Sequence, residues 1–311
     1  MNEMYSLRFK KNIRFRHPVS LALLLKDGRL AFAVENLIFI HNCKNFKCDL
    51  IIKGNKNKIS ILEQLPNGKL ITYGREIKLY IISQKKYYCE HTYILSIFED
   101  EYSYILLAPI SNEMMAVKTE TSLMFFNCKP PFNLIKEVQS EKTAIILYKL
   151  QQRNLLFLCC DITFRAYFWD INLYKEIATI KNIGCSLNGC FIETNQKLIV
   201  AQSCYTQLEN FYIFIINLSS LTIELRIEWN QLKFGQAFNF TEIDDNIFMF
   251  SNTKGLYISS PLGYHMKWIK WKNNKIYMIT KIKKYQIVTI RKRNATVWII
   301  NRHNDSSLLI H

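Results

Sequence analysis

The chain has 311 residues, of which 49% are hydrophobic, 21% charged and 14% aromatic, so it has ample material for a packed core and is not a disordered chain. No apolar run reaches the ~18 residues that a membrane-spanning helix needs, and we expect a soluble globular protein. The formal net charge is +16, from 41 Lys and Arg against 25 Asp and Glu, which favours anionic partners.

The N-terminal segment, residues 1–18, lacks the continuous apolar stretch of a secretory signal. It carries five basic residues against Glu3, and we interpret it as a basic closing strand or arm. The chain has 9 cysteines, an odd number, and no CxxC pair. We therefore expect reduced thiols, no zinc site and a cytoplasmic or nuclear protein that is neither secreted nor transmembrane.

A pattern of polar turn, apolar strand, second turn and second apolar strand recurs along the chain. In its two clearest copies Gly28 and Gly68 are 40 residues apart. The first apolar residues of successive copies are 40, 44, 42, 42, 49 and 40 residues apart. A period of about 40–45 residues with four short strands per unit is typical of propeller blades. The seven repeat cores lie near residues 27–40, 67–80, 112–126, 153–170, 196–216, 245–258 and 285–300.

These repeats resemble the WD-repeat β-propellers. Trp169–Asp170, at the end of a predicted strand, is a literal WD dipeptide, and Val297–Trp298 is a partial match. The Gly-His pair of the family is absent from every unit, so the usual buried hydrogen-bond network around that His cannot form. Apolar packing and strand ladders must then hold the blades together. A seven-bladed propeller of another lineage remains an alternative.

We therefore predict one all-β domain over residues 1–311, a seven-bladed β-propeller of four-stranded antiparallel blades closed by pairing of the chain ends. The resemblance implies this closure, because the family usually places strands from both ends in one blade. Such pairing removes an exposed sheet edge. Residues 7–10 or 13–16 are the N-terminal candidates for this pairing, and residues 307–310 are the C-terminal candidate.

The positive charge is concentrated near the two chain ends. From Asn246 to Asn304 there is no Asp or Glu and the net charge is +12, residues 1–18 carry +4, and the rest sums to zero. Ring closure would bring both segments together as one basic sector, blades six and seven plus the closing strand. A merely solvated face is an equal alternative. The predicted partner-binding residues are Arg8, Lys10, Lys11, Arg14, Arg16, Lys267, Lys270, Lys272, Lys281, Lys283, Lys284, Arg291, Lys292 and Arg293.

Two further features bear on binding. Aromatic residues are interleaved with the C-terminal lysines, which suits stacking on nucleic-acid bases but equally suits core strands. The acidic triplet Glu99–Glu101 either docks a basic partner or forms a solvated turn. The interleaved aromatics are Tyr264, Trp268, Trp271, Tyr277 and Tyr285.

Residues for catalysis or cofactor binding do not form a recognisable motif. The glycines show no phosphate-binding pattern, no two His have i, i+4 spacing and no GxSxG occurs. Consecutive residues of Cys89–His91 point to opposite faces of a strand, Cys159–Cys160 follows an apolar strand, and Asp244–Asp245 indicates a turn. We predict a protein that is not an enzyme and binds no cofactor, metal or small-molecule substrate.

The sequence thus favours a non-catalytic protein-interaction scaffold of the WD-repeat type. In this interpretation the basic sector docks a partner protein with an acidic surface or a phosphorylated segment, through charge-assisted hydrogen bonds. The alternative is direct binding of the same residues to RNA or to anionic lipid headgroups.

Overall fold

The computed structural model describes residues 3–94, 105–140, 144–151, 153–160, 165–181, 183, 190–193, 196–203, 210–230, 237–244, 247–252, 255–259, 267–270, 276 and 278–304. Within these ranges the regular secondary structure consists of the strands β1 to β28. No helix in the described part of the chain is long and apolar enough to cross a membrane.

Six sheets are each built from four consecutive antiparallel strands. Their bounds are β2 Val19–Leu24, β3 Arg29–Val34, β4 Leu37–Asn42 and β5 Cys48–Lys53; β6 Ile61–Gln64, β7 Leu70–Tyr73, β8 Ile77–Ile82 and β9 Tyr87–Tyr93; β10 Leu106–Pro109, β11 Met114–Lys118, β12 Ser122–Asn127 and β13 Asn133–Gln139; β14 Ala144–Lys149, β15 Leu155–Cys160, β16 Arg165–Asp170 and β17 Lys175–Lys181; β18 Cys190–Glu193, β19 Lys197–Ser203, β20 Asn210–Asn217 and β21 Thr222–Asn230; β22 Ala237–Asp244, β23 Ile247–Asn252, β24 Gly255–Ser259 and β25 Lys267–Lys270.

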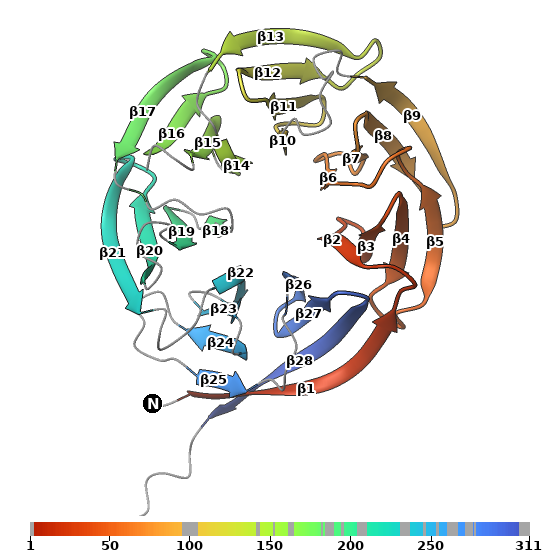
Figure 1. The fold of residues 1–311 in the computed structure, drawn as a ribbon, viewed down its shortest axis with the longest axis vertical. Coiled ribbons are helices and arrows are strands. Elements are labelled where there is room, and N and C mark those ends of the chain that lie inside the picture. The colour runs from red at the N-terminus through yellow and green to blue at the C-terminus, as the bar shows by residue number, and fades with distance from the viewer. Residues whose placement is uncertain are drawn as a thin grey trace, which may run out of the picture.

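One further four-stranded sheet is composite. It consists of β26 (Met278–Lys283), β27 (Gln286–Arg291) and β28 (Asn294–Asn304), with β1 (Glu3–Arg14) as its outer strand. The pairing of β1 with β28 extends from Glu3 opposite Asn304 to Arg14 opposite Asn294. The two ends of the described chain therefore share one sheet (Figure 1).

The sheets are arranged around a common centre (Figure 1). In each of the six consecutive sheets the first strand is innermost and the fourth is outermost. In the composite sheet β26 is innermost and β1 is outermost. Inner strands contact inner strands of the next sheet, as β2 contacts both β6 and β26. This arrangement is that of a β-propeller.

The fold-class prediction of a seven-bladed, closed propeller needs correction. Six blades are formed by consecutive strands, whereas the last repeat supplies only β26 to β28 and takes its outer strand from β1. Among the described residues every sheet is open, and no sheet closes on itself or continues into its neighbour. The physical reason is that neighbouring sheets meet through side chains rather than through a strand ladder.

The expected closing segments also change. Residues 7–10 and part of residues 13–16 belong to the one strand β1, which has a register shift between Phe9 and Lys11. The C-terminal partner is β28, whereas residues 307–310 lie outside the described residues.

Apolar layers between neighbouring sheets form the core. Because side chains alternate along a strand, each central strand sends one set of residues to each neighbouring sheet. Phe157 and Phe168 pack with Phe214 of the next sheet, and all three are fully buried. Every residue of β3 is buried. The central strands therefore read as continuous apolar runs rather than as alternating ones.

Two repeat turns have the same geometry because of their glycines. Gly28 and Gly68 have φ angles of 81° and 90°, which residues with a Cβ atom rarely adopt. The Gly28 and Gly68 amides donate to Leu25 and Leu65, each at 2.9 Å. The 40-residue repeat in the sequence is thus a repeated turn that joins the first and second strands of a sheet.

A second repeated turn lies at the end of the third strand in several sheets. The Asp170 Oδ1 atom of the WD dipeptide accepts hydrogen bonds from the Asn172 and Leu173 amides at 2.8 and 2.9 Å, and Trp169 is buried beside it. The Asn217 side chain accepts in the same way from Ser219. Asn42 and Asn127 do so from Lys44 and Lys129.

Candidate anion-binding site

One edge of the composite sheet gathers basic residues from both chain ends. Asn294 of β28 lies opposite Arg291 of β27 on one side and opposite Arg14 of β1 on the other. Residues directly opposite each other in a sheet project from the same face. Arg291, Asn294 and Arg14 therefore form one row across the sheet, on the face that packs against β22–β25 through Ile287 and Ile300.

A second row of polar residues lies on the same face. Thr296 is opposite both Thr289 and Asn12, and the Thr296 Oγ1 atom donates to Asn12 Oδ1 at 3.3 Å. Asn294 and Thr296 are two residues apart in β28, so both rows share one face. Hydrogen-bonding side chains thus continue along the strands from the basic row.

The turn between β27 and β28 adds two more cations. Lys292 and Arg293 are exposed at this turn. Their carbonyls accept hydrogen bonds from the Val19 and Phe15 amides, at 2.7 and 2.8 Å. These bonds fix the chain segment that follows β1 against the turn, so that Arg16 also lies at this edge. We call Arg14, Arg16, Arg291, Lys292 and Arg293 the basic edge.

A pocket of about 330 Å³ opens at this edge. Burial lowers the pKa of Arg291, which is partly buried, but a guanidinium stays charged at neutral pH. The described lining contains three cations, two amides, one hydroxyl and no carboxylate, a donor-rich set suited to an anion. We call this the rim pocket; its lining residues are Asn12, Arg291, Lys292, Arg293, Asn294 and Thr296.

Other predicted site residues lie elsewhere on the composite sheet. Lys283 and Lys284 are exposed at the turn between β26 and β27, at the far end of β27. The six residues of β27 separate this opposite edge from the basic edge by about 17–20 Å at ~3.3 Å per residue. Lys281 is partly buried on the innermost strand. The predicted sector is therefore divided rather than continuous.

The remaining basic residues of β1 lie farther along this outer strand. Arg8, Lys10 and Lys11 are exposed, and the Lys10 Nζ atom lies 5.2 Å from the centre of the Phe46 ring. Lys267 and Lys270 belong to β25, which contacts β1. Their backbone is therefore next to the composite sheet.

Several predicted features lie outside the described residues. They are Lys272, Glu99–Glu101, Asp245 and the aromatic residues Tyr264, Trp271 and Tyr277.

Residues considered for metal binding or base stacking have other contacts. Glu90 pairs with Lys69 at 2.6 Å, His91 stacks on Phe132 with ring centres 5.0 Å apart, and the Lys284 ammonium lies 5.4 Å from the Tyr285 ring centre. No cluster of three metal-ligating side chains occurs within the described ranges.

No protein-family model and no curated protein matches the sequence. The structure is similar to the Pan2 WD40 domain of Neurospora crassa, with a TM-score of 0.75 and 9% identity over 94% of this chain and 95% of that chain. It is also similar to a chain in the crystal structure of the mitotic checkpoint complex, with a TM-score of 0.73 and 10% identity over 94% of this chain and 93% of that one. The chain has the fold of a WD40 β-propeller. The resemblance to the WD-repeat β-propellers, noted from Trp169–Asp170, is therefore confirmed at the level of the fold.

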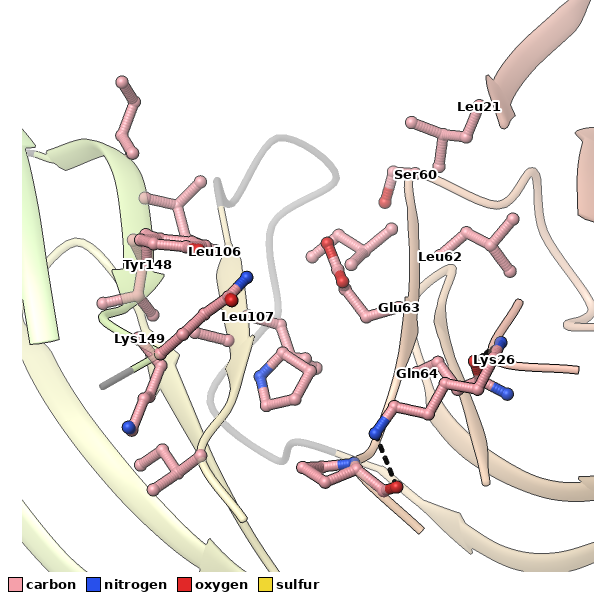
Figure 2. Close-up of a pocket in the computed structure, with 18 residues that line it drawn as sticks. Leu21, Lys26, Ser60, Leu62, Glu63, Gln64, Leu106, Leu107, Tyr148 and Lys149 are labelled. Atoms are coloured by element: carbon pink, nitrogen blue, oxygen red, sulfur yellow. Dashed lines mark hydrogen bonds between the residues drawn. The ribbon is translucent and has the colours of Figure 1, made fainter. Parts of the chain in front are cut away.

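The propeller has a second cavity that the sequence alone does not indicate. A pocket of about 900 Å³ lies between the innermost strands of four successive sheets, and Glu63 of β6 lines it (Figure 2). The available signal was an acidic residue inside the run Ile61–Leu65, which is otherwise apolar except for Gln64. Its significance depends on which strand edge faces the centre, and spacing alone does not give this.

Proposed function

We propose that this protein is a non-catalytic interaction scaffold whose basic edge docks an acidic segment of a partner protein. The WD40 propeller fold fits a scaffold, because a ring of packed sheets holds its turns in fixed positions. One of the similar chains belongs to the mitotic checkpoint complex, which is by its name an assembly. That similarity supports protein partners in general.

The observation that carries the proposal is the rim pocket. It places Arg291, Lys292 and Arg293 around one concave space, with neutral donors beside them and no carboxylate in the described lining. Charge-assisted hydrogen bonds in a partly desolvated pocket are stronger than contacts on an open surface. A phosphorylated or carboxylate side chain of a partner matches this chemistry.

The division of the positive charge favours a protein segment over a polyanion. A nucleic acid or an anionic membrane gains affinity from cations spread along a track or a plane. Here five basic residues meet at the basic edge, while Lys283 and Lys284 lie about 17–20 Å away along β27. The proposal includes a cytoplasmic or nuclear location, in keeping with the free thiols of Cys43, Cys48, Cys89, Cys128 and Cys159.

The test compares two variants of equal charge change. Lys292→Glu with Arg293→Glu alters the basic edge, and Lys283→Glu with Lys284→Glu alters the opposite edge; all four side chains are exposed. The probe is a fluorescent peptide containing phosphoserine among glutamates, titrated at two salt concentrations. We expect the first variant to weaken binding about tenfold or more, the equivalent of ~1.4 kcal/mol, and the second about twofold or less.

Two outcomes would contradict the proposal. Equal loss of peptide binding in both variants would indicate a general effect of net charge. Tighter binding of single-stranded RNA or of phosphatidylserine vesicles than of the peptide, with affinity falling steeply with salt, would favour the polyanion alternative. Circular dichroism of both variants checks that the strands are retained.

A further inference from the structure

The pocket at the propeller centre is separate from the rim pocket and has a different chemistry. It lies between β2, β6, β10 and β14 and is walled largely by apolar side chains, among them Leu21, Leu62, Leu106 and Leu107 (Figure 2). Its volume of about 900 Å³ is in the range of sites that accept a ligand of several heavy atoms.

Glu63 places a carboxylate in this pocket, whose wall has both apolar and polar side chains. Figure 2 shows its side chain extending from β6 toward the side on which Tyr148 and Lys149 lie. The side chain is partly buried, and within the described ranges it has no hydrogen bond or ion pair with another residue. A carboxylate in such surroundings costs free energy unless a cation or donor meets it.

The two lysines of the pocket wall donate hydrogen bonds to backbone carbonyls and not to Glu63. The Lys26 Nζ atom donates to the Pro66 carbonyl at 2.6 Å, as the dashed line in Figure 2 marks. The Lys149 Nζ atom donates to the Leu150 and Arg153 carbonyls at 2.5 and 2.7 Å. Neither ammonium group is paired with Glu63.

Tyr148, which lines the pocket together with Glu63 and the two lysines, supplies no cation either. Burial and the nearby charge of Glu193 raise the pKa of Tyr148, so its hydroxyl stays neutral. Burial lowers the pKa of Lys149, and Glu193 partly opposes that effect. Burial alone raises the pKa of Glu63 to about 7, as expected for a carboxylate without a positive neighbour.

We propose that the central pocket binds the side chain of a lysine from a partner polypeptide, with its ammonium on Glu63 and its aliphatic stem against the leucine walls. The stem of a lysine is apolar over four carbons while its head needs an anion, and the pocket offers both. A single carboxylate without other ligating side chains is a poor metal site, and the described residues contain no metal-ligating cluster.

The test uses a short acetylated alanine peptide with one central lysine, its norleucine counterpart and free 1,5-diaminopentane. We expect the lysine peptide to bind the full-length protein and the Glu63→Gln variant to bind it about tenfold more weakly. Because the carboxylate must be ionised, binding should tighten about tenfold between about pH 6 and about pH 8. Glu137→Gln, the same substitution at an exposed outer-strand residue, should bind like the parent.

Several results would overturn this inference. One is equal binding of the norleucine peptide, which would assign an apolar pocket only. Another is unchanged binding of the lysine peptide by Glu63→Gln, or no binding at either pH. If 1,5-diaminopentane bound as tightly as the peptide, the pocket would be a site for free diamines rather than for a polypeptide. Circular dichroism confirms that Glu63→Gln is folded in each case.

Discussion

Charged side chains inside the propeller have two different environments. Lys118 is 2% exposed, and its ammonium donates to the carbonyls of Thr119, Glu120 and Ser140. The interior thus supplies oxygen partners that offset the cost of burying this cation. Glu63 has no comparable partner among the described residues. The first charge contributes to the fold, whereas the second costs stability whenever it is ionised.

The Glu63 carboxylate predicts a pH-dependent stability difference. Its pKa is raised to about 7 in the folded protein, so between its unfolded value and pH 7 the folded state binds more protons and stability falls as pH rises. Glu63→Gln should therefore be more stable than the parent above about pH 7, by about 1–2 kcal/mol after allowance for solvent in the pocket. The two proteins should be equally stable below about pH 4.5.

Urea unfolding of both proteins at several pH values measures this difference. The control is Glu137→Gln, which should match the parent throughout because that side chain is exposed. A stability gap that is the same at low and at high pH would show that Glu63 acts by packing and not by its charge.

At the residue scale the sequence allowed some predictions and not others. Gly28 and Gly68 were identifiable because their need for positive φ makes them recur at a fixed turn. Arg14 and Arg291 lie in one row across the sheet because of the register of β1 on β28, and their positions in the sequence do not reveal this register. For the same reason the single predicted basic sector is divided between two edges.

At the scale of elements, the turn after the third strand explains the WD dipeptide. Trp169 fills the apolar layer with Leu156 and Leu158, while Asp170 satisfies two turn amides. A residue that accepts hydrogen bonds in this way specifies where the strand ends. The equivalent Asn217 shows that the role requires a side-chain oxygen rather than a negative charge.

Removing this oxygen should weaken the sheet β14–β17. We expect Asp170→Ala to lower the free energy of unfolding by about 1 kcal/mol, since two amides lose their acceptor. Asp170→Asn keeps the oxygen and should remain within about 0.5 kcal/mol of the parent. Denaturant unfolding distinguishes the two, and equal losses in both variants would indicate that the charge, not the turn hydrogen bonds, is required.

Element prediction was successful where apolar runs repeat and uncertain where strands are irregular. The repeats of about 40–45 residues correspond to the second and third strands of each sheet, as in β3–β4 and β7–β8. In contrast, β1 has a register shift between Phe9 and Lys11, which interrupts its alternation. Its two halves consequently resemble separate strands in the sequence.

At the scale of the whole molecule, β1 holds the two ends of the ring together. It pairs with β28 along its length, and Ile13 packs with Leu30 and Phe32 of the next sheet. Deleting residues 1–18 should therefore lower the free energy of unfolding by about 3 kcal/mol or more, because buried apolar contacts are lost and β28 becomes an exposed edge.

Thermal unfolding tests this expectation, with light scattering to detect edge-to-edge association. The matched control replaces Arg8, Lys10, Lys11 and Arg14 by serine, which removes the same net charge of +4 but keeps the strand. It should melt near the parent temperature. A deletion variant that also melted at the parent temperature would show that β1 is dispensable for the ring.

The distribution of charge over the propeller leads to the central claim, that the basic edge docks an acidic protein segment. The most direct measurement is affinity purification of the protein from its native cells, with nuclease and moderate salt, followed by mass spectrometry. The Lys292→Glu, Arg293→Glu variant and the Lys283→Glu, Lys284→Glu variant are purified in parallel. We predict a defined set of proteins that survives nuclease, is retained by the second variant and is lost from the first. A protein set that is unchanged in the first variant, or that disappears on nuclease treatment of the parent, would contradict the claim.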